Sequence, residues 1–377
     1  MKIVFWTVSH LPDIGGLQWS TFRLAKTLKK FGHEVLFLTA TAKISDFDNI
    51  ITTTRILAPN IIEWTTKSGS WLLNNISQFD VIHVIDLFYQ SVGQQFNYLC
   101  HSGLPSVIKI PTMGCIPRII TTPELRYQLN KIDALISLNK GIESELLEVG
   151  VKPEKIHYIP NGIVCEEFIP PSNKGEIKKI LGFTENDVLV LYVGRLVSRK
   201  RLDVLLEVAK RLIGEAKFII MGSGFNMRDS AEEKILDLAQ SISNIYIVKA
   251  QKNTLTYYQA SDIHILLSER EGQPNSILEG MSCALPTIAT NIQGISNLIT
   301  NNIEGILVNV GDIDSTVAAL RKLIYDTELR LTMGENGREK VIRQFEIDIV
   351  ANQYIELYKS LVENKEDDNE NSSNNTI

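Results

Sequence analysis

Two glutamates, Glu271 and Glu279, stand eight positions apart in the segment EREGQPNSILEGMSCALPTIAT, residues 269–290. Between them lies a run of turn-forming and helix-capping residues, which predicts a turn that opens into a helix: Gly272, Pro274, Asn275 and Ser276. The first N–H groups of a helix lack partners within the helix and, with the helix dipole, suit a bound phosphate. Both carboxylates can then contact one phosphate-bearing ligand. The alternative is two solvated glutamates on a loop and a helix, because Glu is common on helices.

This segment resembles the nucleotide-sugar site of the retaining glycosyltransferases of family 4, which have the GT-B fold. Their signature is two Glu separated by seven residues, inside a phrase close to S..EG.PN..LEAM..G.P. The matching residues here are Ser268, Glu271, Gly272, Pro274, Asn275, Leu278, Glu279, Met281 and Pro286. Gly280 stands where the family usually has Ala, and Ala284 where it usually has Gly. Both exchange one small residue for another, so we expect little effect from either.

The resemblance implies a role for each matching residue. Arg195 and Lys200, in YVGRLVSRKRLDVL, would hold the donor diphosphate and stabilise its growing charge without a metal. Glu279 would accept hydrogen bonds from the ribose, and Glu271 would face the donor sugar. The implied catalytic residues are Glu271, Arg195 and Lys200, and the other implied donor-binding residues are Gly15, Gly16, Gly272, Gln273, Pro274, Asn275, Ser276 and Glu279. A solvated basic loop is the alternative for 195–201, where Arg201 replaces the usual Gly and suggests a stiffer loop.

The chain departs from the family in its first half. Many relatives have a sugar-contacting His after the fourth strand, but SVIKIPTMGC has none, and Thr112 or Met113 occupies that region. His83 and His10 are the nearest substitutes, although a lone His at a strand end is more often structural. Gly15 and Gly16 precede a helix and allow the backbone to approach a ligand; an ordinary turn is the alternative.

Three further motifs carry weaker signals. GDID, residues 311–314, contains the Asp-x-Asp that binds manganese in another glycosyltransferase fold, but we expect Asp312 or Asp314 to cap a helix. GSG, residues 222–224, is a lone Gly-x-Gly without a fuller dinucleotide motif, and we expect a loop near the nucleotide. Residues 247–253 fall where the family reads the base, but the usual Gly is absent, so no base specificity follows.

The elements that must position these residues form two series of alternating strands and helices. Apolar runs at residues 2–8, 33–40, 81–86, 106–110 and 134–139 predict strands, and a second series begins near residue 188. Such alternation predicts parallel sheets covered by helices, hence two Rossmann-like domains with the ligand between them at the carboxyl ends of the strands. We expect domains at 1–165 and 166–345, then a helix at 346–362 that returns to the first domain.

Composition limits the class of protein. The chain of 377 residues is 44% hydrophobic and 22% charged, as in soluble globular proteins. A net charge of -6 argues against nucleic acid as a partner. The first 165 residues carry 15 Lys/Arg and 13 Asp/Glu, a weak positive balance that leaves open peripheral contact with a membrane surface. Four scattered cysteines favour a reducing compartment, and no apolar run is long enough to span a membrane. The acidic residues 363–377 predict a disordered tail.

The sequence therefore predicts a cytoplasmic, metal-independent retaining glycosyltransferase without a cofactor. It would move a hexose or N-acetylhexosamine from a nucleotide sugar, with UDP favoured, to a hydroxyl of a glycan, a lipid-linked acceptor or a protein glycan. Three alternatives remain open: a UDP-sugar 2-epimerase of the same fold, a non-catalytic partner subunit, and an NAD-dependent dehydrogenase suggested by GSG alone.

Overall fold

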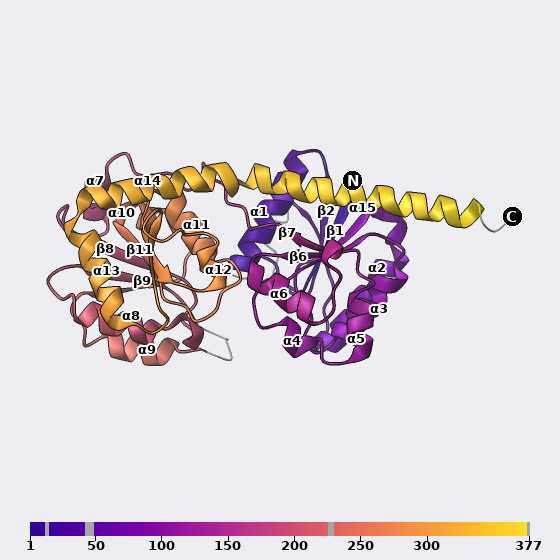
Figure 1. Ribbon diagram of the computed structural model, residues 1–377, viewed down its shortest axis with the longest axis horizontal. Helices are drawn as coiled ribbons and strands as arrows, with labels where there is room; N and C mark the ends of the chain where they lie inside the picture. The colour runs from indigo at the N-terminus through magenta and orange to yellow at the C-terminus, as the bar shows by residue number, and fades with distance from the viewer. Residues whose placement is uncertain (12–14, 42–48, 225–229, 375–377) are drawn as a thin grey trace. The chain divides into compact units, whose positions relative to one another are not determined.

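The computed structural model describes residues 1–11, 15–41, 49–224 and 230–374. The chain divides into two compact units. Unit 1 comprises Met1–Gly162 and Ile347–Ile377, and unit 2 comprises Ile163–Glu346. Each unit is built on one parallel sheet flanked by helices (Figure 1), which is the predicted fold class. The chain crosses between the units at 162/163 and 346/347, near the expected boundaries at 165 and 345.

Unit 1 holds a seven-stranded sheet in the order β3-β2-β1-β4-β5-β6-β7. Its strands are β1 (Lys2–Thr7), β2 (Glu34–Thr39), β3 (Thr52–Arg55), β4 (Val81–Val84), β5 (Ser106–Lys109), β6 (Ala134–Ser137) and β7 (Ile156–Tyr158). Its helices are α1 (Gly16–Lys30), α2 (Ile61–Asn74), α3 (Val92–His101), α4 (Ile116–Ile119), α5 (Pro123–Leu129), α6 (Lys140–Glu148) and α15 (Ile347–Asn374). The central strands are apolar on both sides, as expected for a sheet buried on both faces.

Two hydrophobic cores cover the two faces of this sheet. One contains Trp64 of α2 and Phe96 of α3, and the other contains Leu28 of α1 and Tyr358 of α15. The last helix therefore belongs to unit 1 and packs beside α1 (Figure 1). It continues to Asn374, so the structure extends a helix through most of the stretch that the sequence predicts to be disordered.

Helix α1 ends in a glycine-containing cap. Phe31 is its C-cap, and Gly32 follows with φ +85°, a left-handed conformation that glycine adopts without strain. The N–H of His33 donates to the carbonyl of Leu28 at 3.0 Å and closes the helix end. This cap fixes the direction in which the chain leaves α1 and enters β2.

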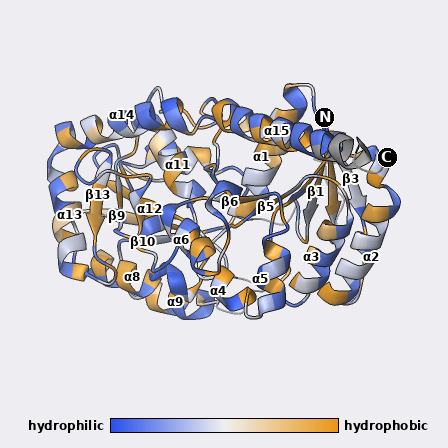
Figure 2. Ribbon diagram, turned by 45° about the vertical axis from the view of Figure 1, so that its right-hand side comes forward, coloured by the Kyte–Doolittle hydropathy of each residue, from blue (hydrophilic) through white to orange (hydrophobic). Residues whose placement is uncertain are grey.

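Unit 2 holds a six-stranded sheet in the order β10-β9-β8-β11-β12-β13. Its strands are β8 (Leu189–Val193), β9 (Lys217–Gly222), β10 (Ile245–Lys249), β11 (Ile263–Leu266), β12 (Thr287–Thr290) and β13 (Gly305–Val308). Its helices are α7 (Lys174–Ile180), α8 (Leu202–Lys210), α9 (Glu232–Ala239), α10 (Leu255–Ala260), α11 (Asn275–Ser282), α12 (Gln293–Ser296), α13 (Ile313–Tyr325) and α14 (Thr327–Gln344). Hydrophobic and hydrophilic residues alternate along α8 and α13 (Figure 2), whose apolar faces join a single core. In the described part of the chain, no helix is long and apolar enough to cross a membrane.

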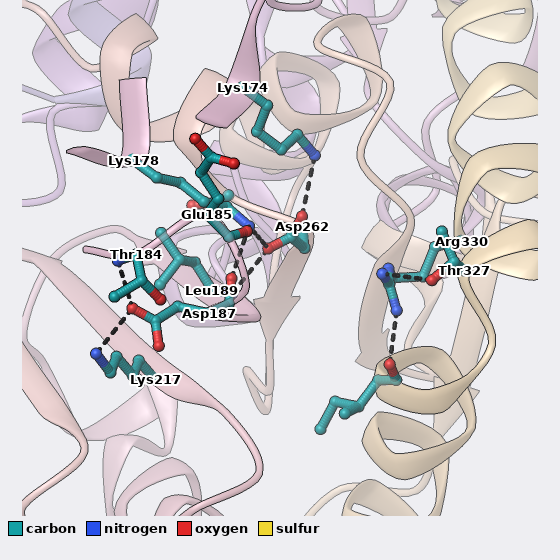
Figure 3. Close-up of polar contacts among 12 residues, drawn as sticks. Lys174, Lys178, Thr184, Glu185, Asp187, Leu189, Lys217, Asp262, Thr327 and Arg330 are labelled. Carbon is teal, nitrogen blue, oxygen red and sulfur yellow. Dashed lines mark hydrogen bonds and ion pairs between the residues drawn. The ribbon is translucent and has the colours of Figure 1, made fainter. Parts of the chain in front are cut away.

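A buried ionic cluster fixes the amino-terminal end of the central strands of unit 2 (Figure 3). Asp262, which precedes β11, accepts from Lys178 at 2.7 Å and Lys174 at 3.2 Å, and from the N–H of Leu189 at 2.9 Å. The side chains of Lys178 and Asp262 are only 5% and 9% exposed. Because three donors converge on this carboxylate, its charge is compensated where water is scarce.

We expect Asp262→Ala to lower the free energy of unfolding by about 3–5 kcal/mol, because it leaves Lys178 buried without a counter-charge. Asp262→Asn should cost less, since the amide can still accept from Leu189. Urea denaturation of the full chain measures both. Glu34→Ala is the control, because its pair with Lys2 is exposed and should contribute nothing measurable. Equal stability of Asp262→Ala and the wild type would contradict this assignment.

Candidate functional site

The predicted donor-site residues of unit 2 lie on segments that follow β8 and β11, where the strand order of this unit reverses. Strands β8 and β11 are neighbours in the sheet, although β9 and β10 separate them in the chain. The segment after β8 carries Arg195 and Lys200, and the segment after β11 carries Glu271. In open parallel sheets, ligands bind outside the carboxyl ends of the strands at this topological switch point. The fold therefore brings two sequence motifs about 70 residues apart to the expected ligand-binding position.

The two segments are joined by a backbone hydrogen bond and an ion pair. The N–H of Glu269 donates to the carbonyl of Arg199 at 2.9 Å. The Arg201 guanidinium contacts the Glu269 carboxylate at 3.0 Å and also binds Asp203. Arg201 has φ 51°, a left-handed conformation. The family's Gly suits this position for that reason, and here the side chain of Arg201 is tied down on both sides instead.

Lys200 and Glu271 form an ion pair through Nζ and Oε1. Lys200 ends the short 3-10 helix Ser198–Lys200, and Glu271 begins the turn before α11. Their side chains are 10% and 11% exposed, so the pair is largely shielded from water. The two residues that the resemblance assigns to diphosphate and sugar thus neutralise each other in this structure.

The charges of this pair contribute to the pKa shifts of two buried side chains. Burial, followed by the charge of Glu271, raises the pKa of the Tyr192 hydroxyl, which donates to the carbonyl of Arg195 at 2.8 Å. Burial, followed by the charge of Lys200, lowers the pKa of His264 to about 3, so its imidazole is neutral at physiological pH. Neither side chain therefore adds charge beside the pair. The charged groups nearby include Lys200, Glu271 and the arginines of the loop after β8.

The loop after β8 packs tightly on the loop after β9. A side-chain carbon at Gly222 would lie 1.8 Å from the carbonyl oxygen of Gly194, and one at Gly224 would lie 2.4 Å from that of Leu196. The N–H of Gly224 also donates to Glu232 of α9 at 2.8 Å. The GSG motif therefore permits close packing behind the loop that carries Arg195, which is itself exposed.

Helix α11 begins at Asn275, and its N-cap is Pro274, whose side chain makes no capping bond. The sequence assigned turn and N-cap roles to Asn275 and Ser276, but the structure places both in the first turn of the helix. Gln273 and Asn275 are buried at this helix start. A turn followed by a helix start, the arrangement that suits a bound phosphate, is therefore present. The helix begins at Asn275, so Asn275 lies within the helix and is not its N-cap.

Glu279 lies in the fifth position of α11, and the buried Tyr258 of α10 holds it. The Tyr258 hydroxyl lies 3.0 Å from Glu279 Oε2 and 3.3 Å from the carbonyl oxygen of Ser276. Tyr258 is fully buried, with Phe168 packed edge-on against its ring. Sequence reasoning missed Tyr258, because YYQASD gives no sign that this hydroxyl reaches a carboxylate 21 residues later.

The two small-residue exchanges in the signature have structural explanations. A side-chain carbon at Gly280 would lie 3.2 Å from the Cβ and Cγ atoms of His264, so the buried imidazole occupies the space of the family's Ala. Ala284 has φ 57° and follows the C-cap of α11. Leu285 and Ala284 donate to the carbonyls of Gly280 and Met281 at 2.9 Å, which is a Schellman motif that favours glycine. The left-handed backbone, and not residue size alone, therefore distinguishes this position.

In unit 1, Gly15 is the N-cap of α1 with an extended backbone and no side-chain cap, and Gly16 is the exposed first residue of the helix. The preceding residues, 12–14, lie outside the described part of the chain. Met113 and Thr112 lie in a half-buried loop after β5, where Gly114 donates to Glu145 at 2.6 Å. This loop occupies the position of the family's histidine.

The two histidines considered as substitutes lie in the core of unit 1. His83 is fully buried within β4, and its Nδ1 lies 2.6 Å from the Tyr358 hydroxyl of α15. Burial lowers the pKa of His83 well below the usual value. His10 is buried and stacks on Phe37 at 3.9 Å between ring centroids. For both histidines, a structural role in the core therefore fits better than a role in the site.

The GDID motif is a helix cap, as expected. The Asp312 carboxylate accepts from the N–H of Ser315 at 2.9 Å and begins α13, and Asp314 pairs with Arg211. Among the residues that the structure describes, no group of three or more His, Cys, Asp or Glu side chains could hold a metal ion. The base-recognition candidate, residues 247–253, overlaps the end of β10.

Both parts of the chain match known protein families. Residues 14–167 match the family described as Glycosyltransferase Family 4, and residues 173–340 match Glycosyl transferases group 1. The chain belongs to glycosyltransferase family 4. Both halves of a family 4 chain are therefore represented, with the 195–200 and 271–279 motifs inside the second match.

Individual relatives of this family 4 chain span several activities. It is 35% identical over 234 residues to UDP-Gal:alpha-D-GlcNAc-diphosphoundecaprenol alpha-1,3-galactosyltransferase of Escherichia coli, a match covering 60% of each chain. It is 23% identical over 375 residues to N-acetyl-alpha-D-glucosaminyl L-malate synthase of Bacillus anthracis, covering 95% of that protein. The crystal structure of Anabaena HepE in complex with UDP has the same fold, with a TM-score of 0.81, 17% identity, and coverage of 96% of this chain and 100% of HepE.

We expect Ala284→Gly to raise the free energy of unfolding by up to about 1 kcal/mol. Relief of the left-handed backbone, worth about 1–2 kcal/mol, should exceed the extra chain entropy of glycine, about 0.4–1 kcal/mol. Ala319→Gly, inside α13, is the control and should lower stability by about 1 kcal/mol or more. Urea denaturation distinguishes them; a loss of stability in both variants would contradict the backbone explanation.

Proposed function

We propose that this protein is a metal-independent, retaining glycosyltransferase that moves a hexose or N-acetylhexosamine from a UDP-sugar to an acceptor hydroxyl. The observation that carries the proposal is the meeting of Arg195, Lys200 and Glu271 with the start of α11 at the β8–β11 switch point. A basic loop, a helix N-terminus and a carboxylate at one sheet edge are the groups that a nucleoside diphosphate-sugar requires. Family membership supports the same assignment.

Each residue has a distinct chemical role in this proposal. Arg195, Lys200 and the N–H groups at the start of α11, with Gly272, Gln273, Pro274, Asn275 and Ser276 shaping the turn, bind the diphosphate. Glu279, held by Tyr258, accepts from the ribose hydroxyls, and Glu271 faces the sugar. Gly15 and Gly16 belong to unit 1, and their donor-binding role stays a prediction of the resemblance.

The reaction proposed is front-face substitution. The acceptor oxygen bonds to the anomeric carbon on the face from which the diphosphate leaves, and the bond between that carbon and the phosphate oxygen breaks. The departing phosphate oxygen takes the acceptor proton, so no separate base is needed. Negative charge grows on the diphosphate as the bond breaks, and fixed cations stabilise it without a metal. Glu271 positions a sugar hydroxyl or stabilises positive charge on the sugar.

The acceptor is proposed to be a glycan, a lipid-linked glycan or a protein glycan. The Escherichia coli relative acts on a lipid-linked acceptor according to its name, and a Staphylococcus aureus relative, 30% identical over 243 residues, is named for capsular polysaccharide biosynthesis. These names support an acceptor in glycoconjugate or polysaccharide assembly. A cytoplasmic location, with contact at the inner membrane face, fits such an acceptor.

We expect UDP and UDP-sugars, more than GDP- or ADP-sugars, to raise the melting temperature of the protein in the presence of EDTA, because a ligand of the folded state stabilises it. The same samples should slowly hydrolyse the donor sugar without an acceptor. Stabilisation that requires manganese would contradict metal independence. Binding without hydrolysis would indicate a non-catalytic subunit, and a new nucleotide sugar formed from UDP-N-acetylglucosamine alone would indicate an epimerase.

We expect Arg195→Ala to lower turnover at saturating donor by at least roughly 100-fold, about 2.7 kcal/mol, while donor affinity falls less. The charge that Arg195 meets is larger in the transition state than in the ground state. Arg195→Lys should recover only part of the loss, because Lys lacks the two-pronged guanidinium. Arg211→Ala, an exposed arginine paired with Asp314, is the matched control. A rise in KM with unchanged turnover would mean that Arg195 only holds substrate.

A further inference from the structure

We propose that Glu271 competes with the donor diphosphate for Lys200 and thereby weakens nucleotide binding. This inference rests on the proposed function, because it names a second role for a residue of the same site. In its first role Glu271 faces the sugar. In its second role it is the counter-ion that Lys200 must leave before that ammonium can bind phosphate.

The pair is built into the scaffold of unit 2. Lys200 is followed by Arg201, whose guanidinium is tied to Glu269 and Asp203. The backbone of Glu271 packs under α12, where a side-chain carbon at Gly294 would lie 2.4 Å from the Glu271 carbonyl oxygen. Other residues therefore fix the backbone on each side of the pair. The fold itself places Lys200 beside Glu271.

The surroundings of the pair make its charges effective. Both side chains are about one-tenth exposed, and the neighbouring rings of Tyr192 and His264 are uncharged. In such a setting a charge is poorly screened, and the attraction between the partners is stronger than at the surface. Within the described part of the chain, Glu271 is the carboxylate paired with Lys200.

A diphosphate at this position faces two penalties from Glu271. It must draw the Lys200 ammonium away from an existing partner, and it must approach a carboxylate of its own sign. When Lys200 turns to the phosphate, the Glu271 carboxylate becomes available to the sugar. Once the sugar has been transferred, the Glu271 carboxylate can pair with Lys200 again. This pairing favours release of the nucleoside diphosphate.

Calorimetry with UDP tests the competition directly. Glu271→Gln keeps the shape of the side chain and removes its charge, so it should bind UDP at least about fivefold more tightly than wild type, about 1 kcal/mol. Uridine, which lacks phosphates, should bind both proteins equally. Turnover should fall in the same variant, because the sugar-facing carboxylate is lost. Glu279→Gln should weaken UDP binding, since its partner in the proposal is the ribose.

Glu269→Gln is the matched control. It removes the same charge two residues earlier, but its ion-pair partner is Arg201 and its side chain is about half exposed. It should change UDP affinity less than twofold, because Asp203 still holds the Arg201 guanidinium. An equal gain in Glu269→Gln and Glu271→Gln would mean that lower net negative charge alone explains the effect, which would overturn the proposal.

A double-mutant cycle assigns the effect to Lys200. Lys200→Ala should weaken UDP binding, and adding Glu271→Gln to Lys200→Ala should bring no more than a twofold gain. The full fivefold gain in the absence of Lys200 would overturn the competition, as would unchanged or weaker UDP binding by Glu271→Gln alone. Circular dichroism and melting curves check each fold. If Glu271→Gln fails to fold, Glu271→Asp replaces it and should show a smaller gain, because its shorter side chain reaches Lys200 less well.

Failure of the proposed donor would be visible separately. A wild-type protein without measurable affinity for UDP at millimolar concentration contradicts the nucleotide assignment, and pyrophosphate then serves as the probe. Tighter pyrophosphate binding by Glu271→Gln than by wild type and Glu269→Gln would still support the competition at Lys200. Equal pyrophosphate binding by the three proteins would overturn it.

Discussion

The parallel pairing of β8 with β11 is the constraint on which the candidate site depends. It places the carboxyl ends of two strands side by side, although more than 60 residues separate them in the chain. The bond from Glu269 N–H to the Arg199 carbonyl extends this pairing beyond the strands. The ion pair of Arg201 with Glu269 joins the same two segments, so the basic loop and Glu271 keep a fixed relation. Catalytic charges need such rigid support, because stabilisation of a transition state requires groups already in place.

The same pair of strands carries a buried ionic contact at each end, and the two differ in a way that fits different roles. At the amino end, Asp262 receives two lysines and a backbone N–H, so its hydrogen-bonding capacity is largely used. At the carboxyl end, Lys200 and Glu271 meet as a simple pair. Removing a partner is costly at both ends. In the proposed competition, the donor diphosphate takes the place of Glu271 beside Lys200 at the carboxyl end. The first contact is therefore suited to hold the sheet, and the second to exchange.

The sequence predicted the central strands well, because strands buried on both faces appear as continuous apolar runs. It did not single out β3, β7 and β13. The edge strand β3 reads TTTR and has no apolar alternation, β7 has only three residues, and β13 pairs through Gly305. In the site, the family signature placed Glu271 and Glu279 correctly on either side of a helix start. It could not reveal the contact of Lys200 with Glu271 or of Tyr258 with Glu279, because such contacts depend on strand order and helix packing and leave no periodic pattern.

Backbone angles explain two departures from the family pattern. Arg201 and Ala284 both replace a usual Gly, and both have positive φ, so the family's preference reflects backbone geometry and not side-chain size. Arg201 gains an ion pair with Glu269 that joins the two site segments, whereas Ala284 gains no comparable contact from its methyl group. At Gly280, a side-chain carbon would lie 3.2 Å from the buried His264, so glycine leaves room for that ring. His83 and His10, the substitutes considered for the loop at Thr112 and Met113, are held in the core. Under the proposed function, the sugar contact that the resemblance assigns to a histidine would come from other groups. In the proposed competition, the Glu271 carboxylate becomes available for that contact when Lys200 binds phosphate.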